Sequence, residues 1–517
     1  MKFSSAKEES VWVTTAKLPA RPSVTADFAV DVCIVGAGIA GLTTAYLLMK
    51  AGKTVAVLDK GELVSGMTQV TTAHLSNAID DRFVNIEKWH GEEGSRLAAE
   101  SHAAAIDRID SISKELGIDC DFKRLDGYLF PAPEDDYKLL QDELAASHRA
   151  GVVQAEMVAH LPLATFDPGQ AIRYPNQARF HPLKYLAGVA RAIVDQGGQI
   201  YTHSHVESVE GGPNAKVKIG GHTISAGAVV VATNSPINDL VAIHTKQAPY
   251  MTYVVGASVP RGSVADALYW DTQDSYHYVR LQPMESTGIG ENDSNAKYDL
   301  LIVGGEDHKS GQADDTIDRH QNLENWARER FSMIESIEFK WGGQCMETFD
   351  GLAFIGRNPL DKENVYVVTG DSGMGITHGT IAGMLITDLI LGWPNSWEKL
   401  YEPSRKTLRA AGGFLKENVN VARQYADWVT PGEVSSIDEI EFDSGAVIRR
   451  GLKKVAVCRD AQGKVTELSA VCPHLGCIVH WNDAERTWDC PCHGSRFASN
   501  GAVINGPANV DLPSAET

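Results

Sequence analysis

The 517-residue sequence lacks long hydrophobic runs and has few basic residues relative to acidic ones. Its longest apolar runs, such as 55–58 and 228–232, have the length of a β-strand and fall far short of the ~20 residues that span a bilayer. The first 24 residues contain neither an apolar signal core nor a twin arginine. We therefore expect a cytoplasmic protein without a membrane partner.

The shortage of basic residues also bears on partners. The 67 acidic and 47 basic residues give a net charge of -20. Such a surface repels phosphate backbones and anionic lipid headgroups, so no nucleic-acid partner is expected. Acidity commonly serves solubility, and it is also compatible with a basic redox partner protein as electron acceptor.

Cysteine is scarce, and half of it lies in one short segment. Cys33, Cys120, Cys345 and Cys458 are scattered, whereas the other four lie between residues 472 and 492. Scattered cysteines in a reducing compartment are usually small buried hydrophobes. The clustered cysteines indicate a metal or redox site.

The order of expected elements suggests several domains. Residues 1–28 are expected to form an irregular leader. Buried strands are expected at 30–35, 54–59 and 226–232, helices at 84–117 and 136–150, a helix, a glycine stop and a strand at 180–210, and a strand, glycine loop and helix at 364–392. Between about 245 and 345 the alternation of apolar and polar residues predicts a β-rich unit.

The C-terminal part differs in composition. From Trp393 to Pro431 there are prolines, charges and aromatics without a strong period, and short strands and turns follow. We place an oxidoreductase domain at 29–400, a connecting segment at 401–431 and a small all-β domain at 432–517.

A dinucleotide-binding turn is expected near the N-terminus. Gly36, Gly38 and Gly41 form G-x-G-x-x-G directly after a strand and before a helix. The glycines allow a tight turn, close backbone approach to a pyrophosphate, and close helix–strand packing, while the helix N-terminus faces the anion. Asp59, at the end of the next strand, is placed to bind ribose hydroxyls.

Six stretches, in the right order over residues 28–400, resemble the D-amino-acid-oxidase-like family of flavoproteins. They are residues 31–60, 66–76, 180–200, 229–236, 350–359 and 364–392, with Asn234 replacing a family glycine and Ala353 a family proline. The resemblance implies an α/β FAD-binding Rossmann-type domain with an inserted β-rich substrate domain. It implies FAD contacts by Gly36, Gly38, Ile39, Ala40, Gly41, Asp59, Lys60, Thr68, Thr71, Thr72, Ala73, His74, Val206, Thr233, Gly370, Gly373, Met374, Gly375 and Ile376.

The same resemblance bears on how FAD is held. Some relatives attach it covalently through a histidine, and the corresponding place here is Gln69–Val70, so non-covalent FAD is expected. His74 is nearby and is expected to be a hydrogen-bonded structural histidine. A helix starting near His378 is expected to point its N-terminus at the pyrimidine end of the flavin, which favours negative charge on the reduced ring.

The second cofactor motif is Cys472-Pro-His474 followed by Cys490-x-x-His493. A zinc site is an alternative, but zinc fingers usually pair cysteine with cysteine and histidine with histidine in each spacing. One cysteine and one histidine in each loop resemble the Rieske [2Fe-2S] domain instead. The resemblance implies that Cys472 and Cys490 bind one iron and that His474 and His493 bind the other.

Further details resemble the Rieske proteins of cytochrome bc complexes. There, two additional cysteines form a disulfide, which implies a Cys477–Cys492 bond here. Ser495 matches a serine that donates to a bridging sulfide, and residues 506–508 match the proline loop over the cluster. Phe497 stands where those proteins have a hydrogen-bonding tyrosine, so a lower reduction potential than theirs is expected.

Together the two resemblances imply an FAD-dependent dehydrogenase that oxidises the C–N bond of a small amine or amino-acid-type substrate. The Rieske cluster would relay single electrons to an external acceptor, such as a redox protein. Tyr276, Tyr278 and Arg280 are expected to bind the substrate, because they share one strand face opposite His277 and because tyrosine and arginine often bind a substrate carboxylate in relatives. An ordinary sheet face with an exposed arginine is the alternative. No catalytic base is identifiable.

Other functions stay open from sequence. An NAD(P)H-driven reductase feeding a partner oxygenase would need a second nucleotide-binding unit. The nearest candidate, residues 300–311, has a strand and glycines, and we expect no helix after it. A non-catalytic electron carrier is a third reading, and a Rieske oxygenase is disfavoured because no two-histidine–carboxylate iron site follows the motif.

Overall fold

The first sheet carries the expected dinucleotide-binding unit. The computed structural model describes residues 6–133, 135, 137–238, 243–284, 298–313, 315–359 and 361–515. This sheet has the strand order β16-β17-β10-β1-β2-β7, with β9 paired to β10 and β8 paired to β9. The strands β1, β2, β7, β10 and β17 run parallel, as helical crossovers require. Their bounds are β1 Phe28–Val35, β2 Val55–Leu58, β7 Gln199–Tyr201, β8 Val206–Glu210, β9 Ala215–Ile219, β10 His222–Val231, β16 Phe354–Arg357 and β17 Val365–Thr369.

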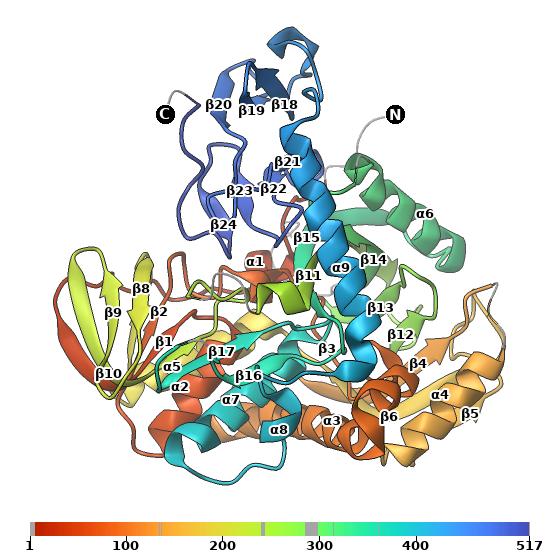
Figure 1. Ribbon diagram of the computed structural model, residues 1–517. Coiled ribbons are helices and arrows are strands. Elements are labelled where there is room, and N and C mark those ends of the chain that lie inside the picture. Colours follow the sequence, from red (N-terminus) through yellow and green to blue (C-terminus); the bar gives the residue numbers. More distant parts are fainter. Residues whose placement is uncertain are drawn as a thin grey trace, which may run out of the picture.

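Helices cover this sheet (Figure 1). The second half of β1 is fully buried, as in a parallel strand covered on both faces. The helices are α2 Ile39–Lys50, α3 Arg82–Glu115, α5 Pro182–Asp195 and α7 Gly375–Leu391. Helix α3 bends at Gly91, whose φ of 75° only glycine adopts readily.

The second sheet is largely antiparallel and has nine strands in the order β15-β11-β14-β13-β12-β4-β6-β3, with β5 beside β6. The bounds are β3 His74–Leu75, β4 Lys123–Phe130, β5 Glu156–Val158, β6 Ala171–Arg179, β11 Gln247–Pro260, β12 Leu268–Asp271, β13 Tyr278–Pro283, β14 Tyr298–Lys309 and β15 Ser336–Thr348. Helices α4 Tyr137–Arg149 and α6 Arg319–Arg330 accompany it. The β-rich stretch supplies β11 to β15, but four strands come from earlier in the chain.

Residues 300–311 lie in this sheet. Gly304 and Gly305 are in the middle of β14, where Gly304 leaves room for the Tyr278 ring. A helix, α6, does follow, contrary to expectation, but it starts only at Arg319. The glycines therefore form no strand-to-helix turn that could hold a nucleotide.

The C-terminal domain consists of two small antiparallel sheets. The first comprises β18 Ser444–Arg450, β19 Lys453–Arg459 and β20 Val465–Ser469. The second comprises β21 His480–Asn482, β22 Thr487–Asp489, β23 Arg496–Ala498 and β24 Val503–Asn505. Figure 1 shows this domain seated on the end of the flavin-type domain where β11 and β15 emerge.

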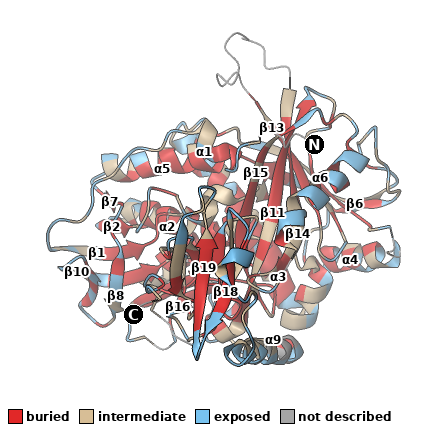
Figure 2. Ribbon diagram, turned by 90° about the horizontal axis from the view of Figure 1, so that it is seen from above, coloured by how far each residue is buried: buried red, intermediate tan, exposed pale blue. Residues whose placement is uncertain are grey.

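Two segments expected to be irregular contain helices. The leader includes α1 Val11–Thr15, where Trp12 is completely buried and donates to the Thr71 carbonyl at 2.6 Å. The connecting region includes α8 Glu398–Tyr401 and α9 Ala411–Gln424. Figure 2 shows the buried strands β11 and β15 and the exposed outer face of α9. Short 3-10 turns occupy Met67–Val70, His244–Lys246, Thr316–Asp318, Leu408–Ala410, Tyr425–Trp428 and Ile437–Glu439.

Within the described parts of the chain, no helix combines the length and the hydrophobicity needed to cross a membrane.

Candidate functional site

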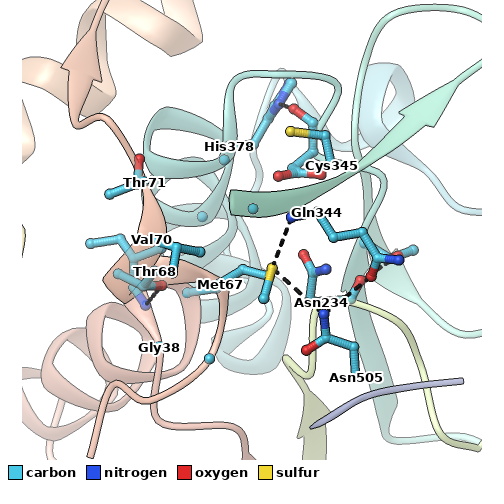
Figure 3. Close-up of a pocket in the computed structure, with 18 of the residues that line it drawn as sticks. Gly38, Met67, Thr68, Val70, Thr71, Asn234, Gln344, Cys345, His378 and Asn505 are labelled. Atoms are coloured by element: carbon cyan, nitrogen blue, oxygen red, sulfur yellow. Dashed lines mark hydrogen bonds between the residues drawn. The ribbon is translucent and has the colours of Figure 1, made fainter. Parts of the chain in front are cut away.

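A cavity of about 310 Å³ lies between the two large sheets, and its wall also includes residues of the C-terminal domain. Figure 3 shows side chains from the 3-10 turn Met67–Val70, from β15 and from the C-terminal domain around it. Most of the predicted flavin motifs contribute residues to the wall of this cavity. Sixteen of the predicted residues line it: Gly36, Gly38, Ile39, Ala40, Asp59, Lys60, Thr68, Thr71, Thr72, His74, Val206, Thr233, Gly373, Met374, Gly375 and Ile376.

The strand–turn–helix unit has the geometry of an anion-binding turn. Gly36 has a φ of 109°, and a Cβ there would lie 2.3 Å from the carbonyl oxygen of Ala232. A Cβ on Gly41 would lie 1.9 Å from the Gly36 oxygen, so Gly41 serves helix–strand packing and does not line the cavity. Gly38 precedes α2 and has no capping side chain of its own, while Ile39 N donates to the Thr68 hydroxyl at 3.2 Å. The helix N-terminus faces the cavity, which favours a phosphate there.

The acidic residue at the end of β2 is held in place by backbone donors. Asp59 accepts hydrogen bonds from Ala37 N at 2.8 Å and from Gly61 N at 2.9 Å. Burial raises the pKa of its carboxyl despite these donors. Lys60 also lines the cavity, and its amino group donates to the carbonyl oxygens of Val503 and Ile504 at 3.1 and 2.7 Å, so it joins the two domains.

The third glycine motif closes the opposite side of the cavity. Helix α7 begins at Gly375, three residues before the expected start, and Gly373, Met374, Gly375 and Ile376 line the cavity. His378 is buried, with Nδ1 at 2.9 Å from the Asp371 carbonyl. Gly370 lies behind the wall, where a Cβ would meet the Thr348 methyl at 2.4 Å. A helix N-terminus again faces the cavity.

The predicted substrate residues separate into two groups. Tyr276 and Tyr278 line the cavity, with ring centroids 5.3 Å apart, whereas His277 is buried elsewhere, paired with Asp271 at 3.0 Å. Arg280 does not line the cavity and is fully buried. Its guanidinium donates to the carbonyls of Ala73 and Phe180 at 2.9 and 3.1 Å.

These contacts place Arg280 behind the cavity wall and fully buried, whereas a carboxylate-binding or an exposed arginine was expected. Its guanidinium donates to backbone carbonyls of the buried loop at 72–73, which need donors, and to the side-chain oxygen of Gln282. Ala73 is itself buried, with a φ of 59°, and lies behind the wall. His74 has Nδ1 at 3.1 Å from the Thr72 hydroxyl, as expected of a structural histidine.

Four carboxylates in the cavity were not recognised from sequence: Asp80, Asp307, Glu347 and Asp371. Burial raises the pKa of Asp80 and Asp371 to about 6 and that of Asp307 to about 7. Burial and the neighbouring Asp81 also raise the pKa of Glu347. They come from four separate parts of the chain. The period-two spacing of Cys345 and Glu347, which both line the cavity from β15, is the one sequence signal that could have marked part of this group.

The second motif forms a compact buried site in the C-terminal domain. Its two loops, 472–477 and 490–495, face each other. The thiols of Cys472 and Cys490 lie within hydrogen-bonding distance of one another. The rings of His474 and His493 are edge to face, with centroids 5.0 Å apart. Cysteine thus faces cysteine and histidine faces histidine across the loops.

This donor set fits the predicted [2Fe-2S] cluster. Buried Nδ1 of His493 has no hydrogen-bond partner among the described residues, as a metal-ligating nitrogen would lack one without its metal. The three cysteine sulfurs of Cys477, Cys490 and Cys492 also lie close together, but Cys477 and Cys492 form a disulfide and cannot act as thiolate ligands. The predicted disulfide is therefore present.

The surroundings of the loops agree with the predicted details. Ser495 hydrogen-bonds Cys472, and its hydroxyl accepts from Ala508 N at 3.0 Å, which ties the 506–508 loop to the cluster site. Phe497 is fully buried and offers no hydrogen bond to the cysteines. The position of a hydrogen-bonding tyrosine is thus occupied by an apolar ring.

Comparisons with known proteins agree with both sites. Residues 31–389 match the family described as FAD dependent oxidoreductase, and residues 428–516 match the Rieske [2Fe-2S] domain. The chain is 30% identical over 508 residues to YhfW of Bacillus subtilis, described as a Rieske 2Fe-2S iron-sulfur protein, covering 98% of this chain and 97% of that one.

Two further relatives match only the larger part. Gamma-glutamylputrescine oxidoreductase of Escherichia coli is 26% identical over 377 residues, which cover 70% of this chain and 84% of the relative. Among solved structures, glycine oxidase from Geobacillus kaustophilus superposes with a TM-score of 0.57 at 18% identity, covering 73% of this chain and 99% of that one. The last likeness concerns the fold alone.

Proposed function

Because this chain belongs to the FAD dependent oxidoreductase family and carries a Rieske [2Fe-2S] domain, we propose that it is a dehydrogenase for a small amine or amino-acid-type substrate, with the cluster as its internal electron acceptor. FAD and the [2Fe-2S] cluster are its cofactors. When bound, FAD takes two electrons with a hydride, whereas the cluster takes one electron at a time. The cluster would pass electrons to an external acceptor.

The proposed electron relay from flavin to cluster is supported by the fact that both domains line one cavity. Ile504, Asn505, Gly506, Ala508 and Asn509 of the Rieske domain line the same cavity as the flavin motifs. Asn509 Nδ2 donates to the Val206 carbonyl at 2.9 Å, and Lys60 holds strand β24. A domain that closes the flavin cavity is favourably placed to accept electrons from it.

The charges in the cavity favour an amine. Asp80, Asp307, Glu347 and Asp371 are carboxylates, whereas among the described lining residues Lys60 is the one lysine or arginine. Lys60 already donates to two carbonyls of the Rieske domain. Buried carboxylates are stabilised by a cation, so they favour a substrate with a protonated amino group. The Escherichia coli relative is named for gamma-glutamylputrescine, which is an amine as well.

The protein's own groups would orient this substrate. Tyr276 hydrogen-bonds Asp80, and the Tyr278 and Thr252 hydroxyls lie 2.7 Å apart. The two tyrosine rings and Trp270 form an apolar wall beside the carboxylates. The carboxylates would bind the ammonium group and accept its proton, which gives the neutral amine that hydride loss requires, with the carbon next to nitrogen against this wall. Closure by the Rieske domain would exclude water.

Anaerobic absorbance spectroscopy of the purified protein against a panel of amines, amino acids and NAD(P)H tests the proposal. An amine should bleach the flavin bands, and the Rieske absorbance should then change as the cluster is reduced. Bleaching by NAD(P)H alone would instead support a reductase that feeds a partner. If no small molecule bleaches the flavin while the two centres still exchange electrons, the protein is an electron carrier.

A further inference from the structure

One side chain spans from the flavin cavity to the cluster loop. Gln344, on β15, lines the cavity and is 2% exposed. Its Nε2 donates to the carbonyl oxygen of Gly494 at 2.8 Å. Gly494 directly follows the cluster ligand His493 in the chain. Figure 3 shows Gln344 and Asn505 of the Rieske domain on either side of the Met67 sulfur, which dashed lines join to both residues.

The other atoms of this amide are also fixed. Oε1 accepts from Asn505 Nδ2 at 3.3 Å, and Nε2 also reaches the Ser310 hydroxyl at 3.3 Å. The Gln344 backbone N–H donates to the Met67 sulfur at 3.3 Å. An amide with both ends bonded inside a buried contact has a single orientation, so its link to Gly494 is a permanent part of the structure.

The cluster loop is packed directly on the flavin domain. A Cβ on Gly494 would lie 2.4 Å from the Pro249 Cβ and 2.8 Å from Gln344 Nε2. A glycine is therefore needed at position 494 for the backbone of the cluster loop to contact the flavin domain. No side chain at this position separates His493 from β11 and β15.

The imidazole side of the cluster site meets the flavin domain as well. His244, which is 2% exposed, lies edge to face against His474, with centroids 5.1 Å apart, and 6.2 Å from His493. The two histidines that would bind the second iron are thus the ones turned toward the flavin domain.

From this geometry we propose that Gln344 is the bridging residue through which electrons pass from the flavin cavity to the cluster. The inference rests on the proposed relay. With both cofactors bound, one electron would leave reduced FAD and one ferric ion of the cluster would become ferrous. Electronic coupling falls steeply across empty gaps, and the Gln344 amide replaces such a gap with a chain of covalent and hydrogen bonds ending beside His493.

Two other interdomain contacts each lack one end of this connection. Lys60 reaches β24, which carries none of the predicted iron ligands. Gln312 Nε2 donates to the Pro491 carbonyl of the cluster loop at 3.1 Å, but Gln312 is not part of the cavity wall. Gln312 is therefore a matched control, with the same amide on the same loop.

The test is flash photoreduction of the holoprotein with a deazaflavin sensitiser and EDTA as electron donor, following flavin and cluster absorbance. This needs no amine substrate, so it remains decisive if no substrate is found. Gln344→Leu should slow the flavin-to-cluster phase about fivefold, equivalent to about 1 kcal/mol in activation free energy. FAD content and the cluster EPR spectrum should match those of the unaltered protein.

Gln312→Leu should transfer electrons at the unaltered rate. If Gln344→Leu assembles poorly, Gln344→Met keeps the length of the side chain and should give the same slowing. Unchanged transfer in a Gln344 variant that retains both cofactors would overturn the proposal. Equal slowing in Gln312→Leu would overturn it too, because domain docking in general would then control the rate.

Discussion

Arg405 of the connecting region and Asp350 before β16 form a buried, two-pronged ion pair. Arg405 Nε and Nη2 donate to the two carboxylate oxygens at 2.8 and 2.7 Å, and both side chains are under 10% exposed. Nη1 also donates to the Ala353 carbonyl at 2.8 Å. The pair fastens the start of the segment that leads to the Rieske domain onto the flavin domain.

Breaking this pair should destabilise the protein. Arg405→Met leaves an uncompensated buried carboxylate, and we expect a loss of about 3 kcal/mol in the free energy of unfolding, measured by urea denaturation of the flavin domain signal. Glu115→Gln removes the exposed Lys50–Glu115 pair and should cost less than about 1 kcal/mol. Similar losses in both variants would contradict the assignment.

The same pair predicts an acid limit to stability. Burial alone would raise the pKa of Asp350, but the charge and hydrogen bonds of Arg405 outweigh it and hold that pKa well below its usual range. The stabilisation is therefore complete above about pH 4, the unfolded value, and is lost as pH falls through the folded pKa. Urea denaturation at pH 6 and pH 3 should show a smaller decrease for Asp350→Asn than for the unaltered protein.

The assignment of iron ligands makes a spectroscopic prediction. Cys472→Ser should abolish the Rieske EPR signal and most of the bound iron, while FAD remains bound, because the two sites are separate. Cys458→Ser changes a buried cysteine of the same domain outside the cluster loops and should keep the signal. A Rieske signal that persists in Cys472→Ser would refute the ligand set.

Arg280 should matter for stability and not for substrate affinity. Arg280→Met removes donors from at least two buried carbonyls, so a loss of about 3 kcal/mol in unfolding free energy is expected. Arg280→Lys keeps the charge, and the KM for the substrate should stay unchanged in this variant. A selective rise in KM for substrates that bear a carboxylate would restore Arg280 as a substrate-binding residue.

Asp307 should select for a cationic amine. Its Oδ1 is buried without a hydrogen-bond partner among the described residues. Asp307→Asn should raise the KM for a cationic amine about tenfold, or about 1.4 kcal/mol in binding. Because burial raises the pKa of Asp307 to about 7, the unaltered protein should bind such an amine more tightly as pH rises through 7, and the variant less so.

A neighbouring aspartate provides the control for this prediction. Asp299 lies on the same strand β14 but outside the cavity wall, next to Arg261. Asp299→Asn should leave the KM unchanged. A higher KM in both variants would point to altered packing of β14, and an unchanged KM in Asp307→Asn would remove this carboxylate from the substrate site.

The sequence by itself determined both cofactor sites, because each is built from short segments. Gly36, Gly38 and Gly41 adopt their turn through local backbone geometry, and Cys472, His474, Cys490 and His493 lie on two loops joined within one small domain. The spacing of these residues along the chain is therefore enough to identify both cofactor sites. The buried α1 and the helix α9 were missed, since a five-residue helix gives little local signal and α9 has Gly412 and Gly413 in its first turn, which disfavour a helix.

Only the tertiary structure decided what surrounds these sites. Alternation placed Arg280 with Tyr276 and Tyr278, but the carbonyls of Ala73 and Phe180, remote in sequence, drew its guanidinium away from the cavity. The acidic residues Asp80, Asp307 and Glu347 come from distant segments, and Gln344 meets Gly494 across 150 positions. Such contacts depend on how the sheets and domains pack, and this packing cannot be predicted from a local pattern of residues.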